Sequence, residues 1–473
     1  MRRESLLHNF NYNLIALMVN NVFLALGVSV VSRVLGPTDY GSANAVISFV
    51  SIFMALIYQG SNIFFTREYT KNRYQAKNFL TYTLNISFAI AVLLMFFSCF
   101  KMFNIPLLYQ MAFIFILSFA HAIDFTWLFR AKESTKIIAL STAVASIIHI
   151  VLIYILSTFL TPGLYLLIFS ITKLLNSIII LFLSREVLND VFHFLKRVPS
   201  LPRFKEDNIG LILALSLSGV FGLIYIKSDV VILGLYNLNY EAGIYASAML
   251  IINFLYVLRG TLLSALVPPL HRKYSNSIME YKVFMGFTIK LGGVMGALIV
   301  GVLLLSSEQI IRLVFGNEYL LASDILDILL FAVLFLFLNM GVSSSLIVTG
   351  EDKAFIFMNL LSALVNVSLN LLLIPIFGMY AAAITSVIAE ASVLIFSIFY
   401  LRYRYSELNM LKIFLRNSYK IFLLLFFSLL PILMFMKDAN YFLQVSMFII
   451  VFGFVLYFGK ILNKKDLDLL LKK

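Results

Sequence analysis

The sequence predicts an all-α polytopic membrane protein with about 14 transmembrane helices, arranged as two six-helix lobes in a parallel repeat followed by two C-terminal helices. Three observations predict this fold class: the composition, the apolar segments and a repeat between the two halves. Of the 473 residues, 62% are hydrophobic and only 12% are charged, whereas a soluble domain has about 25% charged residues. A single core cannot bury this much apolar surface, so the composition excludes a soluble enzyme, a secreted disulfide scaffold and a disordered chain.

Hydropathy divides the chain into fourteen apolar segments, and each is close to the ~20 residues that cross a bilayer. The first segment is too long for a cleaved signal peptide, so we expect it to be retained as a span. The connecting loops are short and leave no room for a soluble domain. The predicted spans are 11–35, 42–66, 78–100, 107–129, 137–160, 164–183, 209–234, 244–268, 283–305, 325–348, 354–374, 381–401, 420–436 and 441–459.

The distribution of charge orients these spans. With the N-terminus inside, the inner segments, counted together with Lys420 at the inner end of the span 420–436, hold 28 Lys and Arg residues and the outer segments hold 3. Basic residues collect in cytoplasmic loops of membrane proteins, so both termini are predicted to be cytoplasmic. The net charge of +13 therefore reports topology and does not indicate nucleic-acid binding.

The two halves of the chain share landmarks at a nearly constant offset. Span 1 ends at Gly36 and is followed by Gly41, while span 7 ends at Gly234 and is followed by Gly243. Each half has six spans and so enters the membrane from the same side, which predicts a parallel repeat about an axis normal to the membrane. The predicted divisions are an N-lobe at 1–183, a cytoplasmic linker at 184–208, a C-lobe at 209–401, and the last two spans with a basic tail at 402–473.

The sequence offers no pattern for a metal site or a bound cofactor. Cys99 is the single cysteine, and the five histidines lack metal-ligand spacing. No phosphate-binding GxxxxGK[ST] loop is present, so an ion gradient of H+ or Na+ is the expected energy source. The longest outer loop, 306–324, is short for a catalytic loop, and we expect a protein that is not an enzyme.

Nine charged residues lie within the predicted spans, where charge is costly and usually faces a cavity or a partner. Lys173 and Glu390 occupy similar depths in the sixth span of each lobe, so they form an inter-lobe ion pair or face separate cavities. Asp124 is expected to pair with Arg130 in the next loop, and Asp327 to lie at the outer interface. Asn366 and Asn370, one helical turn apart, are expected to make interhelical hydrogen bonds, and His149 to pack in the interior.

The segment Ser32-Arg-Val-Leu-Gly-Pro-Thr-Asp-Tyr-Gly41 resembles the signature of the polysaccharide-transporter branch of the multidrug/oligosaccharidyl-lipid/polysaccharide superfamily. The stretches Phe315-Gly-Asn-Glu-Tyr319 and Asn366…Asn370-Leu-Leu-Leu-Ile-Pro375 resemble that branch in the second lobe. The O-antigen flippases, which usually have twelve spans, are the group that the chain resembles most. Lipid II flippases often have fourteen, so a lipid II-type flippase and a multidrug exporter of the same superfamily stay open as alternatives.

The resemblance implies a flippase for undecaprenyl-diphosphate-linked oligosaccharide, an O-antigen or capsule repeat unit in polysaccharide or lipopolysaccharide biosynthesis. It would act by alternating access in the bacterial inner membrane. Its partners would be the lipid-linked oligosaccharide and the bilayer. The polymerase and the glycosyltransferases of the same pathway are further candidate partners. A diphosphate carries negative charge across the membrane, and Lys and Arg can replace its hydration. The candidate substrate-binding residues of a cationic cavity are Arg259, Lys227, Lys290, Lys173 and Arg33, and the candidate ion-coupling residues are Asp229, Glu390 and Asp124.

Overall fold

A computed structural model describes residues 3–69, 76–99, 103–132, 134–183, 206–436, 439–462 and 466. In these ranges every regular element is a helix, which confirms the all-α fold class. The main helices are α1 (Arg3–Tyr69), α2 (Ala76–Ser98), α3 (Leu107–Ala122), α4 (Thr126–Ala131), α5 (Thr135–Ile155), α6 (Pro162–Leu183), α8 (Glu206–Leu235), α9 (Asn239–Asn276), α10 (Ile278–Leu304), α11 (Ser307–Val314), α12 (Leu321–Val348), α13 (Asp352–Arg404), α14 (Met410–Phe435) and α15 (Tyr441–Phe458). Short 3₁₀ turns lie at η1 (Ser157–Phe159), η2 (Asn317–Tyr319) and η3 (Ser406–Leu408).

Within the described ranges, eleven helices are long and apolar enough to cross a membrane. Two of them, α1 and α13, are long enough to hold two spans each, and each contains a glycine whose backbone is not helical. The polytopic membrane fold is confirmed, while the number of fourteen spans stays a prediction. Most of the predicted linker, residues 184–205, lies outside the described residues.

The break in α1 falls between the first two predicted spans. Gly36 has φ 71° and ψ 171°, a backbone conformation that side-chain-bearing residues rarely adopt, and Pro37 follows it. The break in α13 falls at Gly378, with φ 55° and ψ −136°, three residues after Pro375. Each of these two long elements is therefore a pair of spans joined by a one-glycine turn.

The two ends of α13 meet, as expected for a hairpin of two spans. The carboxylate of Glu351, just before α13, accepts hydrogen bonds from the hydroxyls of Tyr400 at 2.7 Å and Tyr405 at 2.9 Å. Arg404 Nε donates to the same carboxylate at 3.2 Å. These hydrogen bonds, led by the one from Tyr400, hold the pKa of Glu351 below its usual range.

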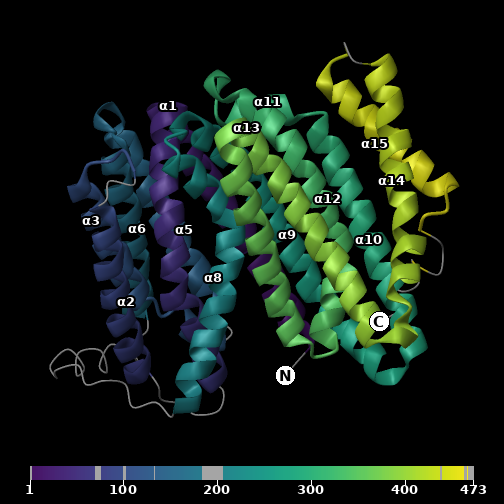
Figure 1. The fold of residues 1–473 in the computed structure, drawn as a ribbon, viewed down its shortest axis with the longest axis horizontal. Coiled ribbons are helices and arrows are strands. Elements are labelled where there is room, and N and C mark those ends of the chain that lie inside the picture. Colours follow the sequence, from purple (N-terminus) through teal and green to yellow (C-terminus); the bar gives the residue numbers. More distant parts are fainter. Residues whose placement is uncertain are drawn as a thin grey trace. The chain divides into compact units, whose positions relative to one another are not determined.

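The chain forms two compact units. The first consists of Met1–Ala246 with Val314–Glu318, and the second consists of Ser247–Leu313 with Tyr319–Lys473. The boundary falls within α9, so α8 groups with the N-terminal helices. The helices of each unit can be followed by colour in Figure 1.

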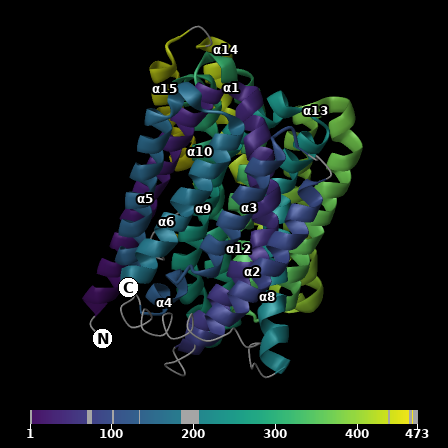
Figure 2. The same cartoon turned by 90° about the vertical axis from the view of Figure 1, so that its left-hand side faces the viewer.

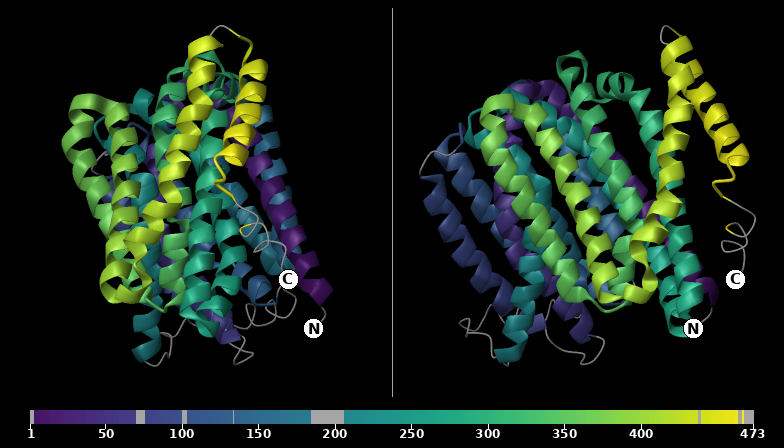
Figure 3. Two further views of the ribbon diagram at one scale, coloured as in Figure 1. Left: turned by 90° about the vertical axis from the view of Figure 1, so that its right-hand side faces the viewer. Right: turned by 45° about the vertical axis from the view of Figure 1, so that its right-hand side comes forward.

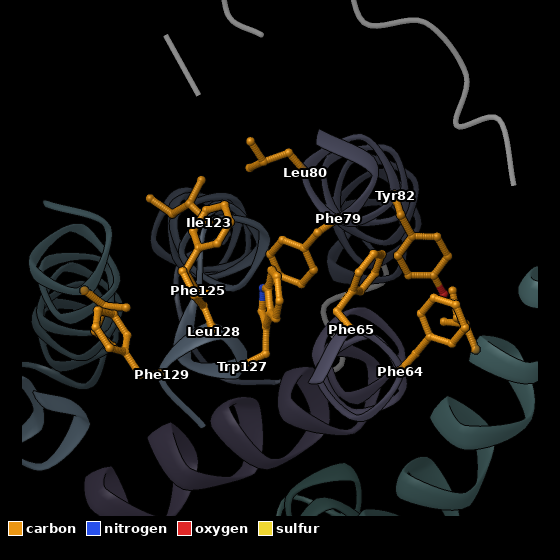
Figure 4. Packing of buried hydrophobic residues seen from close by; sticks show 12 residues of the cluster. Phe64, Phe65, Phe79, Leu80, Tyr82, Ile123, Phe125, Trp127, Leu128 and Phe129 are labelled. Carbon is orange, nitrogen blue, oxygen red and sulfur yellow. The ribbon is translucent and has the colours of Figure 1, made fainter. Parts of the chain in front are cut away.

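In the first unit, α1 packs along α8, and α2, α3, α5 and α6 pack next to one another (Figure 2). At one end of this unit, buried aromatic side chains from α1, α2 and α4 surround Trp127 (Figure 4). Phe65 and Phe79 contact Trp127 with ring centroids 5.7 and 5.3 Å away. Aromatic contacts of this kind add to the area that they bury, so the cluster fixes the ends of three helices.

The turn at Gly36–Gly41 packs against the turn that the repeat predicts to be its equivalent. A Cβ atom on Gly41 would meet the carbonyl of Asn239, and a Cβ atom on Gly243 would meet the carbonyl of Pro37. Each turn therefore places a glycine against the backbone of the other. This reciprocal contact is the arrangement that a twofold repeat predicts.

In the second unit, four glycines of α10 let neighbouring helices approach closely. Cβ atoms on Gly292 and Gly296 would contact Phe337 of α12, one on Gly293 would contact Ile421 of α14, and one on Gly301 would contact Phe448 of α15. Small residues have this role at helix interfaces in membranes. Helix α10 therefore joins α12 to the C-terminal pair α14 and α15, which lie side by side in Figure 3.

Candidate functional site

The candidate residues are divided between the two units. Arg33, Asp124, Lys173, Lys227 and Asp229 belong to the first unit, whereas Arg259, Lys290 and Glu390 belong to the second. Among these eight, Asp124 lies at ion-pair distance from Lys173, and Lys290 lies at ion-pair distance from Asp466. The others must be judged by the polar groups around them.

In the second unit, Arg259 of α9 lies among polar side chains from α12 and α13. Its Nη2 donates a hydrogen bond of 2.6 Å to the hydroxyl of Ser343. Tyr256, one turn earlier on α9, donates from its hydroxyl to Glu390 Oε1 at 2.8 Å. These four residues, Tyr256, Arg259, Ser343 and Glu390, are here called the Arg259 cluster.

The charge of Arg259 is only partly balanced. Glu390 interacts with it electrostatically, but no carboxylate of the described residues lies within ion-pair distance of its guanidinium. Its Nε–H is buried without an acceptor in the described part of the chain. A guanidinium has five N–H donors, and this one uses a neutral hydroxyl for its one hydrogen bond there. It therefore retains the capacity to bind an anion.

In the first unit, a second polar group lies at the junction of α3 and α4, where α6 packs against α3. Lys173 Nζ is 3.5 Å from Asp124 Oδ2, so Lys173 of α6 takes the place expected for Arg130 and has its ion-pair partner within its own unit. His121 precedes Asp124 by three residues, interacts with it and with Lys173 electrostatically, and stacks on Tyr58 with ring centroids 4.7 Å apart. These four residues, Tyr58, His121, Asp124 and Lys173, are here called the Asp124 cluster.

Asp124 lies where the helix is interrupted. Helix α3 ends at Ala122 and α4 begins at Thr126. The other carboxylate oxygen, Oδ1, accepts from the backbone N–H of Thr126 at 3.0 Å, which satisfies a donor left free by the break. Non-helical backbone inside a membrane protein requires such internal partners. Asp124 is therefore both a structural cap and one half of an ion pair.

Lys227 and Asp229 are close in sequence but have different environments. Asp229 is buried and accepts a hydrogen bond of 2.6 Å from the hydroxyl of Tyr245. Lys227 has no ion-pair partner among the described residues. Arg33 is exposed next to the Gly36 turn, and its Nε donates to the carbonyl of Val314 at 3.2 Å. Arg33 thus tethers the 314–318 segment in this structure.

Lys290 contacts the C-terminal segment. Its Nζ lies 2.8 and 3.0 Å from the two carboxylate oxygens of Asp466, 176 residues later in the chain. The sequence did not indicate this partner, because nothing in the local pattern links the two positions.

Several other expectations are confirmed. Asn370 donates to Asn366 at 3.0 Å, and Asn366 donates across the Gly378 break to Ser386 at 3.4 Å. His149 Nδ1 is 3.1 Å from the hydroxyl of Thr172, as suits a packed histidine.

Sequence reasoning missed Tyr256, Ser343 and His121. The sequence spacing could have indicated two of them, because Tyr256 precedes Arg259 by three residues and His121 precedes Asp124 by three. Residues at that spacing share one face of a helix. Ser343 offered no signal, since it comes from another helix and has a serine directly after it in a run of three.

Comparison with solved structures shows which class of proteins shares this fold. A solved structure titled "Lipid II flippase MurJ, inward closed conformation" has a TM-score of 0.68 with 16% identity and covers 94% of this chain and 98% of that one. A structure of the MATE multidrug transporter DinF-BH has a TM-score of 0.58 with 15% identity over 86% and 97% of the two chains. The chain thus has the fold of flippase-like transporters. The two similar structures are a flippase and a transporter, not enzymes.

The family follows from the sequence comparison. The profile described as "Polysaccharide biosynthesis protein" matches residues 6–273, more than half of the chain. A Staphylococcus aureus relative, "Capsular polysaccharide biosynthesis protein CapF", is 23% identical over 399 residues, which cover 82% of this chain and 97% of the relative. The chain belongs to the polysaccharide biosynthesis protein family, as the motif around Gly36–Gly41 predicted.

Proposed function

We propose that this protein is a flippase for an undecaprenyl-diphosphate-linked oligosaccharide. The cargo would be an O-antigen or capsule repeat unit, moved from the cytoplasmic to the outer leaflet of the bacterial inner membrane by alternating access. Family membership, the similarity to CapF and the flippase-like fold support this proposal. The distribution of basic residues supports a cytoplasmic location for both termini.

The observation that carries the proposal is the state of Arg259. An intramembrane guanidinium bonded to a neutral hydroxyl, with an N–H donor left over, is suited to an anionic ligand. Charge-assisted hydrogen bonds to phosphate are about twice as strong as neutral ones. In the first unit, Lys227 has no ion-pair partner among the described residues and is the second candidate cation.

Lys173, Lys290 and Arg33 have weaker claims to direct substrate contact. Each has a partner of its own in this structure: Asp124, Asp466 and the carbonyl of Val314, respectively. A substrate phosphate would have to displace those partners. We therefore rank Arg259 and Lys227 first among the five candidate cations.

Energy coupling is assigned to a proton or sodium gradient without a bound cofactor. Asp124 is the first candidate for the coupling carboxylate because it interacts electrostatically with both Lys173 and His121 within one unit. Asp229 and Glu390 are the second candidates, and each accepts a hydrogen bond from a tyrosine hydroxyl.

Purified protein in proteoliposomes with a fluorescent undecaprenyl-diphosphate oligosaccharide tests the proposal. Arg259→Ala removes a charge-assisted hydrogen bond, a loss of about 1.5–3 kcal/mol, and should lower the translocation rate by about tenfold or more. Lys227→Ala should act in the same direction, and Arg259→Lys should retain part of the rate because the charge remains. The amount of folded protein should stay at the wild-type level.

Arg312→Ala is the matched control. Arg312 is an exposed cation on α11 paired with Glu308 at 2.7 Å, so its loss should leave the rate unchanged. Full translocation in both the Arg259 and the Lys227 variants would disprove the cationic cavity. Transport of lipid II or of a cationic dye, with no transport of the oligosaccharide lipid, would favour the two alternatives instead.

A further inference from the structure

The second unit contains a cavity that shares only Lys290 with the candidate substrate-binding residues. It has a volume of about 640 Å³ and lies between the first turns of α10, the beginning of α14 and the segment that follows α15. This volume is in the range of small-molecule sites, roughly 300–1,000 Å³. Six basic side chains line it: Lys282, Lys290, Lys412, Arg416, Lys420 and Lys460.

The basic residues greatly outnumber the acidic ones. Glu407 and Asp466 are the two carboxylates of the lining, and among the described residues only Lys290 of the six cations has an ion-pair partner. Lys420 donates to the carbonyl of Gly459 at 3.3 Å. Cations that outnumber the carboxylates around them create a positive potential that attracts an anionic ligand.

Asp466 occupies part of this cavity. Its side chain is 9% exposed, and both of its oxygens contact the ammonium of Lys290. It arrives from the far end of the chain, outside the helices that form the walls. The carboxylate thus stands where the oxygens of an anionic ligand would bind, and it is attached to the protein.

The position of the cavity indicates which leaflet of the membrane would supply an anionic ligand. It lies at the end of the unit where α10 and α14 begin, at Ile278 and Met410. The excess of basic residues favours the cytoplasmic leaflet for this end. Phe287, Ile413 and Ile461 contribute apolar wall next to the cations. Basic pockets between transmembrane helices on the cytoplasmic side bind the head groups of anionic lipids.

We propose that this cavity binds the phosphate head group of an anionic phospholipid of the inner leaflet. Asp466 is a tethered competitor that leaves Lys290 when the lipid enters. The proposal does not depend on which substrate the protein carries, because the residues that form the cavity lie at the ends of α10, α14 and α15 and outside the Arg259 and Asp124 clusters.

Binding of phosphatidylglycerol to the purified full-length protein, measured by native mass spectrometry against phosphatidylcholine, tests the proposal. A basic residue near the membrane surface contributes about 1 kcal/mol to binding of anionic lipid, roughly fivefold. We therefore expect Lys412→Gln with Arg416→Gln to weaken phosphatidylglycerol binding about 25-fold. Asp466→Asn should strengthen it, since the competing carboxylate is gone while the side chain keeps its size.

Arg272→Gln with Lys273→Gln is the matched control, because these two cations lie at the same end of the unit but outside the cavity lining. Its phosphatidylglycerol binding should stay within about twofold of the unmodified protein. Equal binding of the two lipids to the unmodified protein, which needs no variant to fold, would overturn the proposal. So would weaker binding in Asp466→Asn, or equal losses in the two double variants.

The same measurement with added inorganic phosphate and pyrophosphate separates the sources of the anion. The lipid assignment predicts that neither ion displaces phosphatidylglycerol at equal concentration, because the apolar walls contribute only to the lipid. Displacement by either ion would show a site for a free phosphate group and would overturn the lipid assignment.

Discussion

At Asp124 a single carboxylate has two structural partners. One oxygen accepts from the backbone N–H of Thr126 and the other lies 3.5 Å from Lys173. The aspartate thereby links the α3–α4 break to α6. A proton or sodium ion bound to this carboxylate would weaken its attraction to Lys173. The ion-bound and ion-free states of the site would then differ in how α3 and α6 are held together, which is what a coupling residue requires.

Asp124→Asn should therefore uncouple transport from the ion gradient. Asparagine has the same shape and can still accept from the N–H of Thr126, but it cannot release or bind a proton. Coupling between two sites is commonly about 1–3 kcal/mol, or roughly 5–150-fold. We expect the stimulation of translocation by an imposed pH or sodium gradient to fall by at least about fivefold in proteoliposomes.

Asp39→Asn provides the comparison for this variant. Asp39 is an exposed carboxylate in the Gly36–Gly41 turn, and its neutralisation should leave the gradient response intact. An undiminished response in Asp124→Asn would assign coupling to Asp229 or Glu390. Stimulation by one gradient and not the other would identify the ion.

At the residue scale the sequence singled out charged positions but did not indicate their partners. Asp124, Arg259 and Lys290 stood out because a charge in an apolar segment is expensive. Their neighbours Lys173, Ser343 and Asp466 lie 49, 84 and 176 positions away, and no local pattern encodes contacts over such separations. The expected pair of Asp124 with Arg130 relied on proximity in sequence, whereas helix packing supplied a lysine from α6.

Among the elements, the turn glycines show how the chain specifies a close contact. Gly36 is required for its positive φ, while Gly41 is required because its partner is backbone. A side chain can rotate away from an added methyl group, but the Asn239 carbonyl and the Gly243 amide cannot move without shifting α9. These are different reasons for glycine at two positions of one motif.

Gly41→Ala should destabilise the folded protein by about 1–3 kcal/mol, the usual cost of overpacking. Gly222→Ala is the matched control, because Gly222 lies within α8 and a Cβ atom there would meet nothing within 4 Å. Alanine in an open helical position should stabilise by about 0.5–1 kcal/mol. Thermal unfolding of the two variants in detergent should move in opposite directions from the wild type, and a shared direction would contradict the contact.

The sequence predicted the helix breaks that contain a glycine, but it did not predict the break between α3 and α4. Gly36 and Gly378 both have positive φ and fall in the gaps between predicted spans. The break between α3 and α4 was not predicted, because Ile123, Asp124 and Phe125 contain neither proline nor glycine and the hydropathy is continuous. A hydrogen bond from the Thr126 backbone to Asp124 stabilises it, and hydropathy averaged over a span does not detect one side chain.

For the whole molecule, composition and periodicity predicted the helical membrane fold because the bilayer demands long apolar helices with every backbone group paired. The repeat was visible because glycines cannot be replaced where Gly41 and Gly243 meet backbone. The grouping of α8 with the N-terminal helices was not predicted. It depends on the packing of α1 along α8, including Gly60 against Ile212, which hydropathy does not encode.

The orientation of the whole molecule can be tested through its single cysteine, Cys99, which is exposed near the end of α2. The positive-inside distribution predicts that this end is outside and that the Arg272–Ser275 end of α9 is inside. A membrane-impermeant maleimide should label Cys99 in right-side-out vesicles without lysis. In a Cys99→Ser background, Ser275→Cys, at a site that is also exposed, should be labelled only after lysis. The inverse pattern would reverse the topology and, with it, the leaflet that faces the basic cavity of α10 and α14, so this measurement decides whether inner-leaflet lipids can reach Lys290 and Asp466.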